Sequence, residues 1–367
     1  MGDILTIKEI CASFDIGGQY VGCNELSTGN INNTYKVEYI RDGEQKVYII
    51  QRINKTVFPN PENVMANIVR VTEYVREKVS KEGLSSRKFV LRAFLAKDTK
   101  KPFIVDDNGD YWRCYRFIKN SVTYDASDDL AVIEGAGSAF GRFQNYLDGF
   151  DAKTLYEIIP DFHNTKKRFD ALKTAVDKDE YGRVEGVRVE IEKLLAFEQQ
   201  ATKLQDMLDS GQIPLRVTHN DTKCNNVSFD KDTGEPLAVL DLDTVMSGAI
   251  AHDYGDAIRF IANTRLEDDP DIDNVSLDLE KYKAFTKGFI SQVKGSLTDL
   301  EKKTMNLGVL TITVELAVRF LTDYLTGDKY FKTKYPGHNL DRVHNQTALA
   351  QDVCKKLDTL NQIIQNY

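Results

Sequence analysis

The sequence predicts an α+β protein with two lobes, a β-rich N-lobe of residues 1–118 and a mostly helical C-lobe of residues 119–367. Three observations lead to this prediction. Short runs rich in β-branched and aromatic residues, separated by Gly, Asn and Asp, fill the first part of the chain. Longer runs with apolar residues three and four positions apart fill the rest. A chain of 367 residues is also long enough for two hydrophobic cores.

In the N-lobe, runs filled by apolar and β-branched residues, with Gly and Asn between them, predict a sheet, and one run with helical periodicity predicts a substantial helix. Helices are expected at 8–14 and 63–78. Strands are expected at 20–26, 34–40, 46–52, 89–94 and 111–118.

In the C-lobe, the helical period dominates and is interrupted by a small β-rich stretch. Helices are expected at 128–147, 187–208, 256–262, 279–294, 304–325 and 342–364. Short strands are expected between the second and third of these helices, at 215–218, 227–229 and 237–242. A sheet-rich half followed by a helical half is typical of an α+β protein.

Composition excludes several classes of partner. The net charge is −8 and the pI is near 5.3, which argues against nucleic acid or an anionic membrane, because both require a clustered positive surface. The five cysteines are scattered and never spaced CxxC, so neither a zinc site nor a disulfide framework is expected, and a reducing cytoplasm is the simplest location. A small molecule is the expected partner; the oligomeric state stays open.

The densest cluster of reactive residue types is VTHNDTKCNNVSFD at 217–230, directly after an expected strand. LDLDTV follows at 240–245 and contains Asp241 and Asp243. Phosphoryl transfer needs oxygen ligands for Mg²⁺, a carboxylate for the attacking hydroxyl and a cation for the phosphoryl group. These two segments supply that set. Asp221 is the candidate base, Lys223 the cation, and Asn226 and Asp241 the candidate Mg²⁺ ligands.

Structural explanations compete with these roles. The loop could be polar only because its Asp and Asn residues cap turns and helices. For His219 we prefer a role in orienting the loop backbone to one as a proton shuttle. In HDYGDAIRF, Asp253 is expected to cap a helix and Asp256 to lie in its first turn. Either carboxylate could support the loop from behind. The role of Asp243 stays undefined.

Two features of the N-lobe concern the possible binding of a nucleotide. STGNINN at 27–33 joins two expected strands and could approach phosphates, although a plain hairpin turn explains it equally well. Protein kinases carry a Lys in the strand that here reads KVYIIQR. This chain has Gln51 followed by Arg52, so either the phosphate contact differs or Arg52 substitutes for the Lys.

The loop resembles the protein-kinase pattern H-R-D-x-x-x-x-N, because His219, Asp221 and Asn226 keep its spacing. Over essentially the whole chain, the sequence resembles the aminoglycoside phosphotransferase-like kinases, and most of all the N-acetylhexosamine 1-kinases. The segments that carry this resemblance are 137–147, 213–227, 240–260 and 319–340. It implies a protein-kinase-like bilobal fold and ATP- and Mg²⁺-dependent phosphorylation of the anomeric hydroxyl of N-acetylglucosamine or N-acetylgalactosamine.

Carried over residue by residue, the resemblance implies a role for each matching position. Asp221 would take the proton of the anomeric hydroxyl, and Asn226 and Asp241 would coordinate Mg²⁺. Arg319 and Tyr330 would hydrogen-bond the sugar or its N-acetyl group; otherwise they are an exposed helix charge and a surface aromatic. The residues that would lie over or near the phosphates are Thr28, Gly29, Asn30 and Asn32.

Two other functions remain open. A kinase of choline, homoserine or an aminoglycoside would share the loop, and for the cationic substrates acidic or aromatic clusters are usual. The acid-rich run at 266–273 is instead expected to be a solvated loop. A nucleotide-binding pseudokinase module is opposed by the joint presence of Asp221, Asn226 and Asp241. The sequence does not separate the two N-acetylhexosamine epimers.

Overall fold

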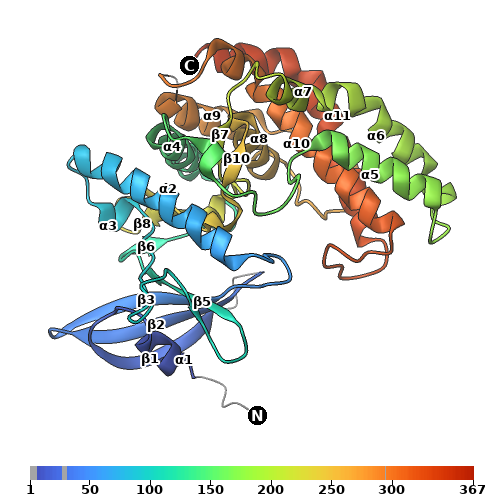
Figure 1. Cartoon of the computed structure of the whole chain (residues 1–367). Helices are drawn as coiled ribbons and strands as arrows, with labels where there is room; N and C mark the ends of the chain where they lie inside the picture. The colour runs from blue at the N-terminus through green and yellow to red at the C-terminus, as the bar shows by residue number, and fades with distance from the viewer. Residues whose placement is uncertain (1–5, 27–30, 294) are drawn as a thin grey trace. The chain divides into compact units, whose positions relative to one another are not determined.

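The computed structural model describes residues 6–26, 31–293 and 295–367 (Figure 1). The chain divides into two compact units. The first comprises Met1–Val122, Thr154–Ile159 and Ser228–Met246. The second comprises the remaining segments, Thr123–Lys153, Pro160–Val227 and Ser247–Tyr367. The first segment of the first unit ends at Val122, and two later segments of the chain return to that unit.

A five-stranded antiparallel sheet forms the N-terminal part of the first unit, in the order β1-β2-β3-β5-β4 (Figure 1). The strands are β1 (Gln19–Leu26), β2 (Asn33–Arg41), β3 (Glu44–Arg52), β4 (Ile104–Val105) and β5 (Tyr111–Arg116). The strands expected at 20–26, 34–40, 46–52 and 111–118 are confirmed within a few residues, because their alternating patterns mark one buried face.

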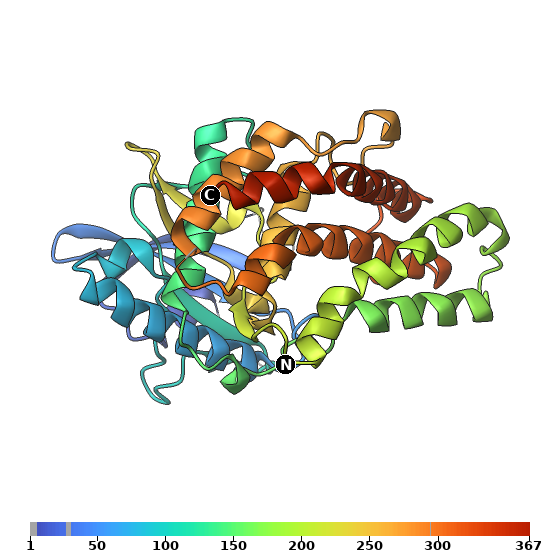
Figure 2. The same ribbon diagram turned by 90° about the horizontal axis from the view of Figure 1, so that it is seen from above.

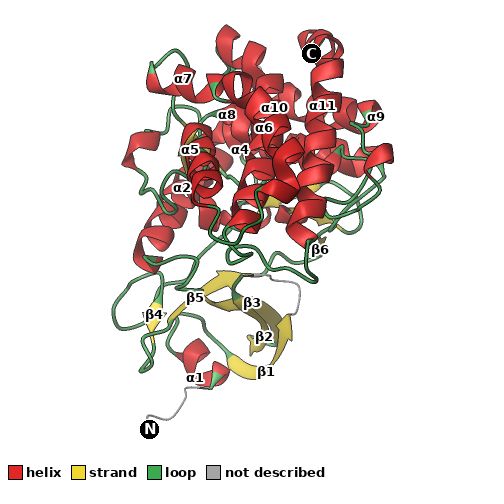
Figure 3. Ribbon diagram, turned by 90° about the vertical axis from the view of Figure 1, so that its right-hand side faces the viewer, coloured by secondary structure: helices red, strands yellow, loops and turns green. Residues whose placement is uncertain are grey.

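The buried face of this sheet packs against α1 (Ile7–Ala12). Val37, Ile50 and Cys114, one from each of three neighbouring strands, join Ile10 of the helix in one hydrophobic cluster. Figure 3 shows the sheet in yellow with α1 beside it. Since side chains alternate across a strand, the residues next to these face the opposite side.

The rest of the first unit consists of α2, a helical turn and a second small sheet. α2 (Pro61–Lys81) begins with a proline at its first position, where the missing N–H has no helical partner to lose. α3 (Ser86–Phe89) follows. The small sheet has the order β6-β8-β9 and contains β6 (Ser121–Val122), β8 (Val227–Asp230) and β9 (Pro236–Val239).

The strand expected at 89–94 is wrong. Its first residue ends α3, and within the rest only Ala93 makes a bridge, to Tyr115. Two backbone bonds, from the Phe94 amide to Cys114 and from the Arg116 amide to Arg92, tie the segment to β5. Apolar and β-branched residues therefore lie against the strand edge without forming a continuous ladder.

The second unit is helical (Figure 2). α4 packs along α9, and α10 packs on α8 and α11. Its helices are α4 (Leu130–Tyr146), α5 (Thr165–Lys178), α6 (Arg188–Ala201), α7 (Lys203–Asp209), α8 (Ile250–Ile261), α9 (Leu279–Val293), α10 (Asp299–Leu325) and α11 (His338–Gln365). The pair β7 (Arg216–Thr218) and β10 (Met246–Gly248) is its small sheet, and the 3-10 turns along the chain include η1 (Ala152–Thr154), η2 (Glu185–Val187) and η5 (Ile272–Asn274).

Glycines bring α8 and α10 into backbone contact. A Cβ on Gly255 would lie 2.3 Å from the carbonyl oxygen of Gly308, and a Cβ on Gly308 would lie 2.0 Å from that of Ala251. Real Cβ atoms do not approach this closely, so no larger residue fits at either position without moving a helix. The crossing fixes α8 on α10.

Two helix predictions need correction. α8 begins at Ile250 rather than near 256, so Asp253 lies in its first turn and does not cap it, and Asp256 lies further inside. Every residue from Ile250 to Arg259 is buried, so no amphipathic boundary marks the start. The helix expected at 187–208 is divided at Thr202 into α6 and α7. α5 was not predicted.

α10 is long and apolar enough to cross a membrane by length and composition, but 83% of its most apolar window is buried inside the unit. That burial is typical of a core helix, since its side chains already contact the helices around it.

All five cysteines carry free thiols.

Candidate active site

The loop that follows β7 is held by two carboxylates of α8. The backbone amides of His219 and Asn220 donate to the Asp253 carboxylate, each over 2.8 Å. The amide of Thr222 donates to Asp256 Oδ2 over 3.0 Å. Because α8 is itself locked against α10, these bonds give the loop one backbone path.

His219 supports the loop in a second way. Its Nδ1 accepts the backbone N–H of Asp221 over 3.2 Å, and its buried ring meets Phe140 and Phe143 edge to face. Asn220, between them, has a left-handed φ of 64°. Asn tolerates this conformation better than most residues, and it turns the chain sharply before Asp221.

The structure brings together three of the predicted residues, Asp221, Lys223 and Asn226. Lys223 Nζ lies 2.7 Å from Asp221 Oδ1. Asn226, which ends the short 3-10 turn η3 (Cys224–Asn226), donates its Nδ2 to the Asp221 carbonyl over 2.8 Å and to Asp221 Oδ2 over 3.2 Å. Both bonds hold Asp221 in place, and the Asn226 amide turns its nitrogen toward Asp221 and its oxygen away from it.

The charges around this loop balance one another. Burial by itself would lower the pKa of Lys223, but the carboxylates of Asp221 and Asp256 outweigh it and raise that pKa. Burial likewise acts to raise the pKa of Asp256, yet Arg259 and Lys223 bring it below its ordinary value. Burial prevails only at Asp253, whose pKa is raised. Lys223 therefore stays charged at neutral pH beside Asp221.

In the first unit, a buried ion pair joins β5 to the segment after β9. Arg113 is 1% exposed and binds both carboxylate oxygens of Asp243, with Nη2 to Oδ2 at 2.9 Å. Asn32 Nδ2 donates to the same Oδ2 over 2.7 Å. Arg113 Nε donates to Gln51 Oε1 over 3.0 Å. Burial acts to lower the pKa of Arg113, but Asp243 holds it above its ordinary range.

This pair accounts for the departure at Gln51. Protein kinases have a Lys at the equivalent position of the third strand. Here Gln51 bonds a guanidinium on the neighbouring strand, so the buried cation of this sheet face comes from Arg113. The sequence offered one overlooked signal: Arg113 is a charged residue among the apolar residues Trp112, Cys114 and Tyr115, which are buried in β5.

The other predicted nucleotide contacts have different outcomes. Arg52 faces the opposite side of the sheet from Gln51, where Nη1 bonds Asp110 over 3.2 Å and Nη2 bonds Asn33 over 2.9 Å. Asn32 joins the Asp243 cluster. Thr28, Gly29 and Asn30 lie outside the described residues. The role of all five in binding phosphates stays a prediction.

Asp241 directly precedes the 3-10 turn η4 (Leu242–Thr244) and adopts a left-handed φ of 53°. Such a backbone at a non-glycine residue is uncommon and is often found at functional sites. Asp241 belongs to the first unit and Asn226 to the second, so the two candidate metal ligands are described separately. Within the described ranges, no group of three or more His, Cys, Asp or Glu side chains could hold a metal ion.

The two predicted sugar-binding residues contact each other in the second unit. Arg319 Nη2 lies 3.3 Å from the Tyr330 hydroxyl. The guanidinium also lies over three aromatic rings, 5.3 Å from the centre of Phe162, 5.6 Å from that of Tyr330 and 5.5 Å from that of Phe331. A planar cation on ring faces is a favourable and well-defined arrangement.

The loop that carries Tyr330 is held by one carboxylate at the end of α10. Asp323 Oδ1 accepts the backbone amides of Lys329 and Tyr330 over 2.9 and 2.7 Å. Its Oδ2 accepts the amide of Phe331 over 3.0 Å and Nδ2 of Asn339 over 2.9 Å. Four bonds to a buried carboxylate pre-organise the loop, so Tyr330 meets Arg319 in a defined geometry.

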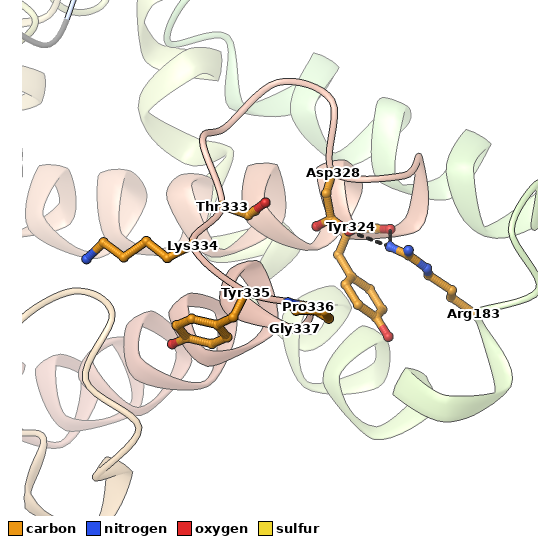
Figure 4. A pocket seen from close by; sticks show the side chains of 8 residues that line it. All are labelled: Arg183, Tyr324, Asp328, Thr333, Lys334, Tyr335, Pro336 and Gly337. Carbon is orange, nitrogen blue, oxygen red and sulfur yellow. Dashed lines mark hydrogen bonds and ion pairs between the residues drawn. The ribbon is translucent and has the colours of Figure 1, made fainter.

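The same loop also borders a hollow of about 460 Å³. Figure 4 shows Arg183 reaching across to Tyr324 and Asp328, with bonds of 2.6 Å to the Tyr324 carbonyl and to the Asp328 carboxylate. The far wall is formed by 333–337. Arg319 and Tyr330 do not line this hollow, so the loop contacts two different environments.

A buried polar cluster that no sequence pattern indicated lies beneath Arg319. Glu315, one turn earlier on α10, is 1% exposed and lies 2.8 Å from His163 Nδ1 and 2.8 Å from Thr165 Oγ1. The ring of His163 lies 5.1 Å from that of His252 on α8. No local pattern marks these residues, because they come from three distant parts of the chain.

Comparison with known proteins defines the class. The pattern of the phosphotransferase enzyme family matches residues 23–282, so the chain belongs to this family. Solved structures agree on the fold. A protein of Ralstonia eutropha JMP134, provisionally assigned as an aminoglycoside phosphotransferase, is 13% identical and superposes with a TM-score of 0.58, covering 95% of this chain and 96% of its own.

Two further solved structures are similar. Choline kinase from Cryptosporidium parvum Iowa II is 12% identical, with a TM-score of 0.54 and coverage of 96% of this chain and 94% of its own. Aminoglycoside phosphotransferase APH(2'')-Ib, in an ADP-bound form, is 10% identical, with a TM-score of 0.50 and coverage of 91% and 95%. The fold is thus the α+β kinase-like fold, as predicted, and the protein is a phosphotransferase.

Proposed function

We propose that this phosphotransferase uses ATP to phosphorylate the anomeric hydroxyl of an N-acetylhexosamine, N-acetylglucosamine or N-acetylgalactosamine, to give the sugar 1-phosphate. One observation favours an N-acetylhexosamine over the other alcohols considered as substrates. The aromatic faces of Phe162, Tyr330 and Phe331, which could have enclosed a quaternary ammonium group, are covered by the guanidinium of Arg319. A fixed cation there favours a neutral, oxygen-rich substrate over choline or an aminoglycoside.

The acid-rich run at 266–273 supports the same choice. Glu267 pairs with Arg259 at 2.6 Å, and Asp271 pairs with Arg265 at 2.8 Å. Asp268 pairs with Lys334 at 2.9 Å. These acids are neutralised by the protein's own basic side chains, so they do not form a free anionic site for a cationic substrate.

The proposed roles in catalysis follow the geometry of the loop. Asp221, oriented by Asn226 and paired with Lys223, accepts the proton of the anomeric hydroxyl as its oxygen attacks the terminal phosphorus. Lys223 stabilises the charge on the transferred group. Arg319 and Tyr330 bind the sugar or its N-acetyl group.

The nucleotide is proposed to be ATP, since one structural neighbour is an ADP-bound phosphotransferase. The proposed contributors of the first unit to phosphate binding are the residues predicted from the sequence, namely Thr28, Gly29, Asn30, Asn32 and Arg52.

Mg²⁺ is the proposed metal. It takes oxygen ligands, keeps several waters, and is usually held by one or two protein oxygens together with the phosphates. The Asn226 amide, anchored through its nitrogen, and the Asp241 carboxylate fit this requirement chemically. When bound, Mg²⁺ would neutralise charge on the phosphates during transfer.

The test is a substrate panel with the wild type and Asp221→Asn. Both would be given Mg²⁺-ATP and N-acetylglucosamine, N-acetylgalactosamine, glucose, choline, homoserine or kanamycin. We expect an N-acetylhexosamine to be converted to its 1-phosphate. Because the general base is lost, Asp221→Asn should lower kcat by about 10³-fold or more, while its melting temperature stays close to that of the wild type. Turnover of choline, homoserine or kanamycin alone would refute the sugar assignment, and no turnover at all would favour a binding module.

A further inference from the structure

Unpartnered buried polar atoms concentrate at one place in the second unit. Across the described residues, six buried side-chain nitrogen or oxygen atoms lack a hydrogen-bond partner. Four of the six belong to one cluster, namely His163 Nε2, Arg168 Nε, and both ring nitrogens of His252. Native proteins leave few buried polar groups unpaired, and each such group calls for an explanation. Four adjacent ones indicate that a polar ligand completes the cluster.

The cluster is rigidly built. His163 Nδ1 is bonded to Glu315, whose second oxygen accepts the hydroxyl of Thr165 over 2.8 Å. The His163 ring also lies near two other rings in tilted arrangements, that of Phe162 at a centroid distance of 4.5 Å and that of His252 at 5.1 Å. Because Nδ1 is bonded to the Glu315 carboxylate and two rings lie against the imidazole, the direction of Nε2 is fixed. This is the arrangement by which proteins orient a histidine toward a ligand.

The position of the cluster links the two parts of the proposed active site that lie in this unit. His252 directly precedes Asp253, whose carboxylate holds the backbone of the Asp221 loop. Glu315 lies four residues before Arg319 on α10, so both project from the same helix face. A substrate that reaches from the catalytic loop to Arg319 would therefore lie along this cluster.

The chemistry of the cluster selects a hydroxyl group. Burial lowers the pKa of His252 to about 3, so its ring is neutral and offers one donor and one acceptor. Arg168 and Arg319 both lie close enough to Glu315 for their charges to interact, which disfavours a cationic ligand. A hydroxyl both donates and accepts, so it satisfies His163 Nε2 in either protonation state.

We propose that His163 is a specificity-determining residue, whose Nε2 hydrogen-bonds a ring hydroxyl of the bound N-acetylhexosamine other than the anomeric one, with His252 completing the same subsite. This inference rests on the proposed function. It adds that Glu315 and Thr165 act through His163 as positioning residues, because they fix its orientation.

The test compares N-acetylglucosamine with its 3-deoxy, 4-deoxy and 6-deoxy derivatives. For the wild type, kcat/KM should fall about 10- to 100-fold for one derivative, because removing its hydroxyl leaves a buried nitrogen unpaired. His163→Asn retains a donor toward Glu315 but has no atom at the Nε2 position. It should lose a similar factor on the parent sugar and treat that derivative and the parent alike, within about threefold.

Two more variants keep the test decisive. His163→Phe preserves the ring packing without either nitrogen and should also lose the discrimination. His344→Asn is the matched control, because His344 also contacts a carboxylate, Glu190, over 3.1 Å but lies outside the cluster; its discrimination should equal that of the wild type. Both substrates are measured on one preparation, so the ratio does not depend on the folded fraction.

The outcomes separate this inference from the proposed function. If the wild type phosphorylates N-acetylglucosamine but His163→Asn and His163→Phe retain the wild-type ratio for every derivative, the subsite is refuted and the sugar kinase stands. The subsite is also refuted if the wild type accepts all three derivatives as well as the parent. If no N-acetylhexosamine is phosphorylated, both proposals fail together.

Discussion

Each unit of the protein contains a buried polar cluster, and the two clusters differ in how they are satisfied. In the first unit, Arg113 and Asp243 bond each other through two pairs of atoms, with further bonds to Gln51 and Asn32. In the second unit, the cluster around His163 leaves four buried nitrogens without partners. Burial is similar in both, so the number of partners distinguishes them.

This difference separates a cluster that stabilises the fold from one that awaits a ligand. A buried charge is tolerated when it is paired and hydrogen-bonded, and its removal is then costly. An unpaired buried polar group lowers the stability of the free protein. The penalty is relieved when a bound ligand supplies the missing hydrogen bond. The distinction predicts differences in stability as well as in activity.

The largest effect is expected from breaking the fully hydrogen-bonded cluster of Arg113 and Asp243. Arg113→Met leaves the buried carboxylate of Asp243 without its counter-charge, so the free energy of unfolding should fall by about 3–5 kcal/mol. The double variant Arg113→Met, Asp243→Leu removes both charges and should recover most of that loss. Urea denaturation followed by circular dichroism measures both. A loss below about 1 kcal/mol in the single variant would show that the pair contributes little.

An intermediate effect is expected in acid. Burial acts to raise the pKa of Glu315, but His163 and Arg319 bring it down to about 2, below its ordinary value of 4.5. A carboxylate with a lowered pKa contributes stability above pH 4.5, and this is lost as pH falls toward 2. Between pH 6 and pH 3, wild type should thus lose about 2 kcal/mol more than Glu315→Gln.

The comparison requires urea denaturation of both proteins at pH 6 and pH 3. Asp268, whose pKa is also lowered to about 2 by Lys334 and His338, contributes to both proteins alike and cancels in the difference. Parallel losses in the two proteins would mean that Glu315 does not carry the acid sensitivity.

The smallest effect, and the one of opposite sign, is expected at His252. Replacing it with Leu removes two unpaired nitrogens while keeping an apolar side chain of similar size. The melting temperature should stay unchanged or rise, equivalent to about 0–1 kcal/mol of added stability, while activity on the sugar falls. Thermal denaturation measures the first and kcat/KM the second. A stability loss of several kcal/mol would instead mean that the His252 nitrogens already have hydrogen-bond partners, and the contrast between the two clusters would no longer hold.

Much of the molecule could be predicted from local sequence. The strands of the first sheet show alternation, and the spacing of His219, Asp221 and Asn226 is itself a local pattern, so the second-unit part of the candidate site could be predicted from the sequence. The ends of helices were predicted less accurately where the helix is buried on all sides. α8 is enclosed on all sides, so its start at Ile250 and the true positions of Asp253 and Asp256 in the helix were missed.

What the sequence by itself determined is therefore the fold class, the phosphotransferase loop and the choice of Arg319 and Tyr330 as candidate substrate-binding residues. Only the tertiary structure decided which side chains complete the two buried clusters. Arg113 and Asp243 are 130 residues apart, and His163 and Glu315 are 152 apart. A hydrogen bond depends on distance in space, and no local periodicity encodes a contact between segments that meet only after the chain has folded.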